Sequence, residues 1–177
     1  MSTLLQKILA IHSSPAICGI KASNLINLKI TDELYEEIEE LNKKYPNLCF
    51  YVLKNDGKNA LILVYRKKVL ERYLFKEENR SFLNSIGYET ESVELMLLSL
   101  RERMEKDSFP HEIGVFLGYD LSDIKSFIDG KECLYVGYWK VYSNVEEKME
   151  IFDKYTRCKN AVMRMIDKGY PIENYMR

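Results

Sequence analysis

The sequence has no excess of charge of either sign and no long hydrophobic run. Its 26 basic side chains almost balance 27 acidic ones, so the net charge is −1 at pH 7. Without a positive field, the chain has no general attraction for a nucleic acid backbone or an anionic membrane surface. No apolar segment approaches the roughly 20 residues that a membrane-spanning helix needs. We therefore expect neither nucleic acid nor membrane as a partner.

Paired cysteines and a secretion signal are also missing. The four cysteines lie far apart, and none belongs to a C-x-x-C pair: Cys18, Cys49, Cys133 and Cys158. We interpret them as free, buried thiols in a reducing compartment. The N-terminus lacks the basic segment and continuous apolar stretch that are typical of a signal peptide. These features predict a cytoplasmic protein.

The overall composition is typical of a globular domain. Hydrophobic residues make up 46% and charged residues 30% of the 177 residues, a balance that does not favour disorder. No repeat, low-complexity tract or linker interrupts the chain. We predict a single domain over residues 1–177, large enough to bury a hydrophobic core.

Helical periodicity recurs along the chain, and most helical segments have recognisable ends. The first helix is expected from Met1 to Ile11 and should end near His12, because Ser13, Ser14 and Pro15 follow. Further helices are predicted after Thr31, from about residue 67, around 81–86, after Thr90, over 110–117 and 121–129, and over about 145–168, before Gly169 and Pro171.

Strand signals are concentrated in two apolar runs on either side of a turn. Residues 48–53 and 60–65 are rich in strand formers, and Asn55-Asp56-Gly57-Lys58 between them is a strong hairpin signal. Both runs are almost entirely apolar, so both faces should be covered. The aromatic and β-branched run at 134–142 predicts another strand of this sheet, and a short strand is expected near 25–28. The predicted fold is therefore α+β, a small and mainly antiparallel sheet packed with several helices.

The segment from Phe109 to Tyr142 is the richest in unusual residues. It contains the single tryptophan, one of two histidines and four of eight glycines. Because proline suits the first position of a helix, Pro110 predicts that His111 and Glu112 lie in a first turn. The helix dipole would then keep His111 neutral, as a general base requires, and free N–H groups could hold an anion. Alternatively, Glu112 only caps the helix and His111 fills a polar gap.

Polar side chains also gather after the first predicted helix. Hydrogen-bond donors and one positive charge surround a glycine there: His12, Ser13, Ser14, Lys21 and Asn24. Lys21 could neutralise an anionic ligand, and Asn24 could orient it. In the structural alternative, Lys21 is solvated and Asn24 bonds to the backbone near the short strand.

Standard catalytic and cofactor motifs are missing from the sequence. There is no G-x-S-x-G elbow, no H-E-x-x-H and no glycine-rich nucleotide loop. Neighbouring helical residues point about 100° apart, so His111 and Glu112 would not readily share a metal, and no metal site is predicted. Residues 110–129 have a helix-turn-helix outline, but the second helix is net negative and does not suit a DNA groove.

Three blocks of residues resemble a known family. They are His12-x-x-Pro15-x-x-x-Gly19-Ile20-Lys21-x-x-Asn24-Leu25, then Phe109-Pro110-His111-Glu112-Ile113-Gly114 with Leu117-Gly118-Tyr119, and finally Gly137-Tyr138-Trp139-Lys140-Val141-Tyr142. Over nearly the whole chain they resemble a bacterial family, domain of unknown function 3793. The chain differs from the family pattern at Cys18, where a small apolar residue is usual, and at Asp120, where proline is. The resemblance implies no particular reaction.

Two hypotheses follow for the function. In the first, a small anionic ligand binds in a pocket formed by the 12–24 loop and the helix start at 110–112, with an aromatic wall from Tyr138 or Trp139. The residues allow catalysis without requiring it, with His111 as the base and Lys21 as the anion stabiliser. In the second, the chain is a protein-interaction or regulatory domain, and the same motifs are caps, turns and sheet packing.

Overall fold

Helices surround a small antiparallel sheet in the computed structural model, which describes residues 1–106 and 109–177. The helices are α1 (Thr3–Ile17), α2 (Asp32–Lys44), α3 (Lys67–Leu74), α4 (Glu77–Ser85), α5 (Val93–Met104), α6 (Ile113–Phe116), α7 (Leu121–Ile128), α8 (Val145–Asp167) and the short η1 (Ile172–Tyr175). The strands are β1 (Ser23–Lys29), β2 (Leu48–Asn55), β3 (Asn59–Arg66), β4 (Tyr135–Val136) and β5 (Lys140–Val141). The α+β prediction is confirmed.

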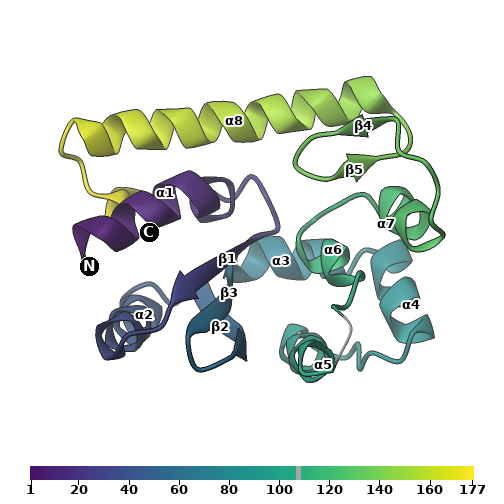
Figure 1. Ribbon diagram of the computed structural model, residues 1–177, viewed down its shortest axis with the longest axis horizontal. Coiled ribbons are helices and arrows are strands. Elements are labelled where there is room, and N and C mark those ends of the chain that lie inside the picture. Colours follow the sequence, from purple (N-terminus) through teal and green to yellow (C-terminus); the bar gives the residue numbers. More distant parts are fainter. Residues whose placement is uncertain (107–108) are drawn as a thin grey trace.

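The central sheet has three antiparallel strands in the order β1-β3-β2 (Figure 1). β2 and β3 form the predicted hairpin. Its turn is held by Asn55 Oδ1, which accepts from the Gly57 backbone N–H at 2.8 Å, and by Asp56 Oδ1, which accepts from the Lys58 N–H at 2.8 Å. β1 pairs with the other side of β3 and confirms the short strand expected near residues 25–28.

Both faces of the sheet are covered by apolar cores. On one face, Ile26, Ile62 and Val64 pack in a cluster that includes residues of α1, α2 and α8. On the other face, Leu63 and Tyr65 pack in a cluster that includes residues of α3, α5 and α6. Successive strand residues point to opposite faces, so a strand buried on both sides is apolar almost throughout. This confirms the interpretation of the two apolar runs.

Helix α1 continues beyond its predicted end near His12, as far as Ile17, with Pro15 inside it. Proline removes one backbone donor, but the surroundings compensate for the disturbed last turn. Ser14 Oγ donates to the Ala10 carbonyl, and Asn24 Oδ1 on β1 accepts from the Ala16 N–H at 3.1 Å. The prediction was wrong because Asn24, which supports the turn, follows Pro15 by several residues and belongs to the next element.

Residues 134–142 do not form a strand of the central sheet, which corrects the prediction. They form a separate two-stranded hairpin, β4–β5, which turns through Gly137, Tyr138 and Trp139. The Gly137 N–H donates to the Trp139 carbonyl at 3.0 Å and closes the turn. A Cβ on Gly137 would lie 2.2 Å from a ring carbon of Phe152 on α8, so this turn requires glycine to reach the helix.

Helix α8 is a long strap that connects the two halves of the molecule (Figure 1). One half packs on α1, where Val162 joins the core beneath the sheet. The other half lies over the β4–β5 hairpin, where Phe152 and Tyr155 form a small cluster with Trp139. Among the helices of the described ranges, none is long and apolar enough to cross a membrane.

The N-cap residue was predicted correctly for α2 but not for α5. Thr31 caps α2 as expected, since its Oγ1 accepts from the Leu34 N–H at 3.1 Å. The cap of α5 is Ser92 instead of Thr90: its Oγ accepts from the Leu95 N–H at 3.2 Å. Both are hydroxyl residues near the helix start, and sequence alone does not separate them.

Gly118, just after α6, packs closely against Ala22, just before β1, and this contact can be tested by mutation. It has a φ of +74°, and a Cβ there would lie 2.9 Å from the Ala22 Cβ. Gly118→Ala should destabilise the protein by about 2 to 4 kcal/mol, because backbone strain and overpacking add. Gly57→Ala is the matched control: its φ is +83° but nothing lies within 4 Å of the added carbon. That change should cost only about 1 to 2 kcal/mol. If urea unfolding shows that both variants lose the same free energy of unfolding, the close contact between Gly118 and Ala22 is contradicted.

Candidate functional site

Residues from all three sequence blocks meet at one pocket beside α6 and α7. Its volume is about 420 Å³. The lining comes from β1, from the segment before α6, from both short helices and from the β4–β5 hairpin: Leu25, Phe109, His111, Ile113, Gly114, Leu117, Tyr119, Asp123, Ile124, Phe127, Trp139 and Lys140. We call it the α6–α7 pocket.

Burial divides the α6–α7 pocket into an apolar floor and a polar rim. The floor side chains are almost fully buried and are mostly aliphatic or aromatic: Ile113, Leu117, Ile124 and Trp139. The rim side chains are exposed: Phe109, His111, Phe127 and Lys140. Lys140 Nζ lies 5.2 Å from the Phe127 ring centroid, and the His111 ring meets the same phenyl ring edge-on at 5.0 Å. The rim therefore combines aromatic surface with basic nitrogen atoms.

Among the described lining residues one has a carboxylate, Asp123, and both of its oxygens already accept hydrogen bonds. It is only 1% exposed. Its Oδ2 accepts from the Trp139 indole Nε1–H at 2.9 Å, and its Oδ1 accepts from the Tyr142 backbone N–H at 2.8 Å. Asp123 thus ties α7 to the β4–β5 hairpin and fixes the orientation of the Trp139 ring. In the sequence, Asp123 is only one of the acidic residues that make this helix net negative; the need of a buried indole for an acceptor was the signal that could have found it.

Tyr119 and Trp139 form a stacked aromatic wall. Their ring centroids are 4.8 Å apart and the planes differ by 22°. The Lys21 ammonium lies 5.3 Å from the Tyr119 centroid, but Lys21 does not line the α6–α7 pocket. It lines another hollow, together with Arg72 and Lys76. The single pocket predicted between the 12–24 segment and residues 110–112 is therefore divided: His111 lies at one hollow and Lys21 at the other.

Helix α6 is shorter than the helix predicted over residues 110–117 and starts later. The helix begins at Ile113 and has only four residues, whereas Pro110, His111 and Glu112 form the turn before it. The Ile113 N–H donates to the Pro110 carbonyl at 3.2 Å. A single helical turn after His111 has little aligned dipole, so the electrostatic argument for a neutral His111 loses its structural basis.

Glu112 holds this turn in place. Its Oε1 accepts from Arg103 Nη1 at 3.1 Å and from the Tyr88 hydroxyl at 3.0 Å. Burial, together with the neighbouring Glu112 carboxylate, raises the pKa of Tyr88. Arg103 also donates to the Ile86 carbonyl. Glu112 therefore connects the segment before α6 to α5, and it does not line the α6–α7 pocket.

The polar residues of the 12–24 segment support the connection between α1 and β1. His12 is exposed on α1, while Ser13 and Ser14 are buried in it. The Ser14 hydroxyl and the Asn24 amide are used by the backbone, as described above. The Ser13 hydroxyl is buried, and no hydrogen-bond partner for it lies in residues 1–106 or 109–177. None of the four lines the α6–α7 pocket.

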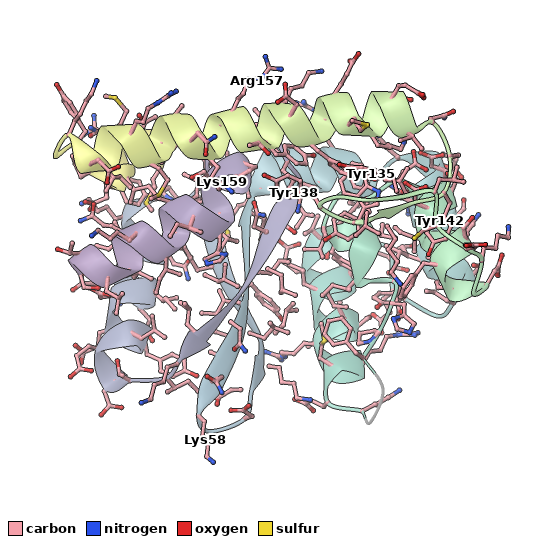
Figure 2. All side chains as sticks on the ribbon, turned by 45° about the horizontal axis from the view of Figure 1, so that its top comes forward. Lys58, Tyr135, Tyr138, Tyr142, Arg157 and Lys159 are labelled. Atoms are coloured by element: carbon pink, nitrogen blue, oxygen red, sulfur yellow. The ribbon has the colours of Figure 1, made fainter. Side chains whose placement is uncertain are left out.

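Of the two candidate aromatic-wall residues, Trp139 lines the pocket and Tyr138 does not. Figure 2 shows Tyr138 beneath the ribbon of α8. Its ring packs against Phe152 and Tyr155, with centroids 5.6 and 5.4 Å away. Its hydroxyl lies 3.2 Å from Thr156 Oγ1. Tyr138 therefore anchors the hairpin turn to α8.

The four cysteines are free, and each is partly exposed. Two of them, widely separated in sequence, are neighbours: Cys18 lies after α1 and Cys158 on α8, and each thiol shifts the pKa of the other. This contact lowers the pKa of Cys18, to which nearby Arg66 also contributes, and raises that of Cys158. The described part of the chain contains no group of three His, Cys, Asp or Glu side chains placed to hold a metal ion.

Comparison with known proteins identifies a family but no characterised relative. The model of a family described as a protein of unknown function, DUF3793, matches residues 9–176. This confirms the resemblance carried by the three sequence blocks. No curated protein and no solved structure matches the chain.

Removal of the Asp123 carboxylate tests its role as the anchor of the pocket wall. Asp123→Ala leaves two inward-facing N–H groups without an acceptor, so it should destabilise the protein by about 2 to 4 kcal/mol. Asp129→Ala, on the exposed end of α7, removes only a surface pair with Lys131 and should cost less than about 0.5 kcal/mol. Urea unfolding followed by Trp139 fluorescence measures both. If Asp123→Ala lowers the free energy of unfolding no more than Asp129→Ala does, the anchoring role is refuted.

Proposed function

The chain belongs to the DUF3793 family, and we propose that it binds a small molecule with an apolar body and an anionic head in the α6–α7 pocket. The observation that carries the proposal is convergence. Residues from three blocks that lie far apart in sequence line one concave, mostly apolar space with a few polar groups at its edge, which is the usual form of a small-molecule site. A cytoplasmic location and a bacterial origin stay predictions from the sequence.

The floor of the pocket favours an apolar or flat ligand body. The buried side chains of Ile113, Leu117 and Ile124 offer no polar atom, and the indole N–H of Trp139 is already bonded to Asp123. A polar group placed there would lose its hydrogen bonds to water without replacement. An alkyl chain or an aromatic ring would instead gain from burial against the Tyr119–Trp139 wall.

The rim favours a negatively charged head. Lys140 is exposed, and His111 lies beside the same phenylalanine. Among the described residues that line the pocket, the only carboxylate is Asp123, which is buried and has both oxygens occupied. An anion at the rim would therefore meet the Lys140 ammonium. In this site, Lys140 has the anion-stabilising role that the sequence assigned to Lys21.

We propose that the pocket binds a ligand. The geometry around His111 does not favour catalysis. A general base needs a side chain that orients its ring, usually through a hydrogen bond. Within the described residues, the His111 ring meets Phe127 edge-on and makes no side-chain hydrogen bond. If a reaction takes place in this pocket, His111 is the residue in position to accept a proton.

Decanoate and decanol test the proposal, since they share an apolar chain and differ in charge. The single tryptophan lies in the pocket floor, so its fluorescence should change on binding of either compound. Lys140→Met should weaken decanoate binding by about three- to tenfold and leave decanol unaffected. Lys131→Met, on an exposed residue outside the pocket, is the control. Absence of any Trp139 response, or equal loss for both ligands, would contradict the proposal.

A second candidate function, protein interaction, is favoured by one observation on the β4–β5 hairpin. Leu134 and Val136 are 69% and 64% exposed, next to a free strand edge. Exposed apolar side chains on a strand edge invite pairing with another chain. If this surface joins two copies of the chain, light scattering should show a mass that rises with concentration, and Val136→Lys should abolish the rise. A constant monomeric mass would exclude self-association.

A further inference from the structure

A second hollow, on the side of α3 and α8, is lined by three cations. Its volume is about 290 Å³. Lys21 comes from the segment between α1 and β1, while Arg72 and Lys76 come from α3 and the residues after it. No aspartate or glutamate of residues 1–106 and 109–177 lines the hollow; the other lining residues are Ile20, Ala22, Val69, Tyr73, Gly118, Ile151 and Tyr155. We call it the Lys21 hollow.

Lys21 is unusual because it is buried without a counter-ion. Its side chain is 4% exposed, and its Nζ donates one hydrogen bond, to the Ser23 carbonyl at 2.7 Å. No ion pair within residues 1–106 and 109–177 includes it. An ammonium group has three donors, and burial of an unpaired charge is costly. The Tyr119 ring, 5.3 Å from the ammonium, compensates only part of the charge, so an anion would satisfy the remaining donors and charge.

Tyr155 provides an independent polar group in the same hollow. It is 7% exposed, and no hydrogen bond of its hydroxyl occurs in the described part of the chain. The other tyrosine of the lining, Tyr73, already donates its hydroxyl proton to the Tyr119 carbonyl. The hollow thus contains a buried ammonium, a mostly buried tyrosine whose hydroxyl makes no hydrogen bond within the described residues, and two exposed cations at its edge.

We propose that the Lys21 hollow is a second ligand site, which binds the phosphate group of a small phosphate monoester. Three basic side chains, with no carboxylate among the described lining residues, favour an anion such as phosphate, and the volume leaves room for a small organic group beside Tyr73 and Tyr155. Lys21 and Tyr155 would donate to phosphate oxygens from inside, and Arg72 would donate from the edge. This site shares no lining residue with the α6–α7 pocket, so it stands or falls independently of the function proposed above.

Anion binding should be coupled to protonation of Lys21. Burial lowers the pKa of Lys21 to about 7, so a large fraction of the free protein carries a neutral amine at neutral pH. The groups around the hollow are the exposed cations Arg72 and Lys76, the Tyr119 ring beside the ammonium, and Tyr73 and Tyr155, whose pKa values are raised mainly by burial. The carboxylates of Asp120 and Glu78 also raise the pKa of Tyr73. A bound anion stabilises the ammonium form and raises the pKa of Lys21. Binding should therefore be strongest below pH 7 and weaken as the pH rises above it.

Calorimetric titration of the full chain with sulfate and with phenyl phosphate tests the proposal. Sulfate does not titrate in this range, so its pH dependence isolates the lysine. Its association constant should fall by up to about tenfold per pH unit above pH 7. Phenyl phosphate, which adds an aromatic ring, should bind more tightly than sulfate in the same hollow.

Three variants distinguish binding in the hollow from non-specific electrostatic attraction of anions to the protein surface. One changes Lys21, between α1 and β1, and two change residues of α3. Lys21→Met removes the buried ammonium but preserves the chain length, so it should reduce sulfate binding by about 30-fold or more and remove the pH dependence. Arg72→Met, on exposed α3 surface, should weaken binding without a change in thermal stability. Lys68→Met, on the same helix but outside the hollow, is the matched control. Two results would overturn the proposal. One is no detectable binding of either anion at concentrations up to about 10 mM. The other is equal sulfate affinity for the wild type and Lys21→Met.

Discussion

The hydrogen bonds of the Asp123 carboxylate are the contacts on which the candidate site depends. Asp123 lies on α7 and accepts from the indole of Trp139 and the backbone of Tyr142, both in or beside the β4–β5 hairpin. A buried carboxylate needs such donors, and a buried indole needs such an acceptor. Each group therefore accounts for the burial of the other. Together they hold the hairpin against α7, and the space left beside α6 is the α6–α7 pocket.

Helix α8 supports this arrangement from above. Phe152 packs against the Trp139 ring with the two planes at 90°, and Tyr138 fills the space next to it. The absence of a side chain at Gly137 allows the hairpin turn to approach that closely. Because the other half of α8 packs on α1, the pocket wall and the segment that carries Lys21 are positioned by one continuous helix. Tyr119 contacts both, since its ring stacks on Trp139 and the Lys21 ammonium lies 5.3 Å from the centroid of the same ring.

Local signals in the sequence predicted the local structure well. Asn55 to Lys58 specify a hairpin turn through their own side chains, and apolar runs on either side report burial on both faces of the sheet. The failures have tertiary causes. Whether residues 134–142 extend the central sheet or turn back depends on the space under α8 at Phe152. Whether α1 stops before Pro15 depends on Asn24, which lies on the next strand. His111 and Trp139, one of the two residues proposed for the aromatic wall, line the same pocket, whereas the position of Lys21 outside this pocket could not follow from spacing.

The most direct test of the proposed function is a crystal structure of the protein soaked with 10-bromodecanoate, in which anomalous scattering locates the bromine. The account predicts the bromine in the floor of the α6–α7 pocket, among Ile113, Ile124 and Trp139, with the carboxylate at the rim beside Lys140. Bromine at any other position, with the α6–α7 pocket filled only by solvent, would contradict it.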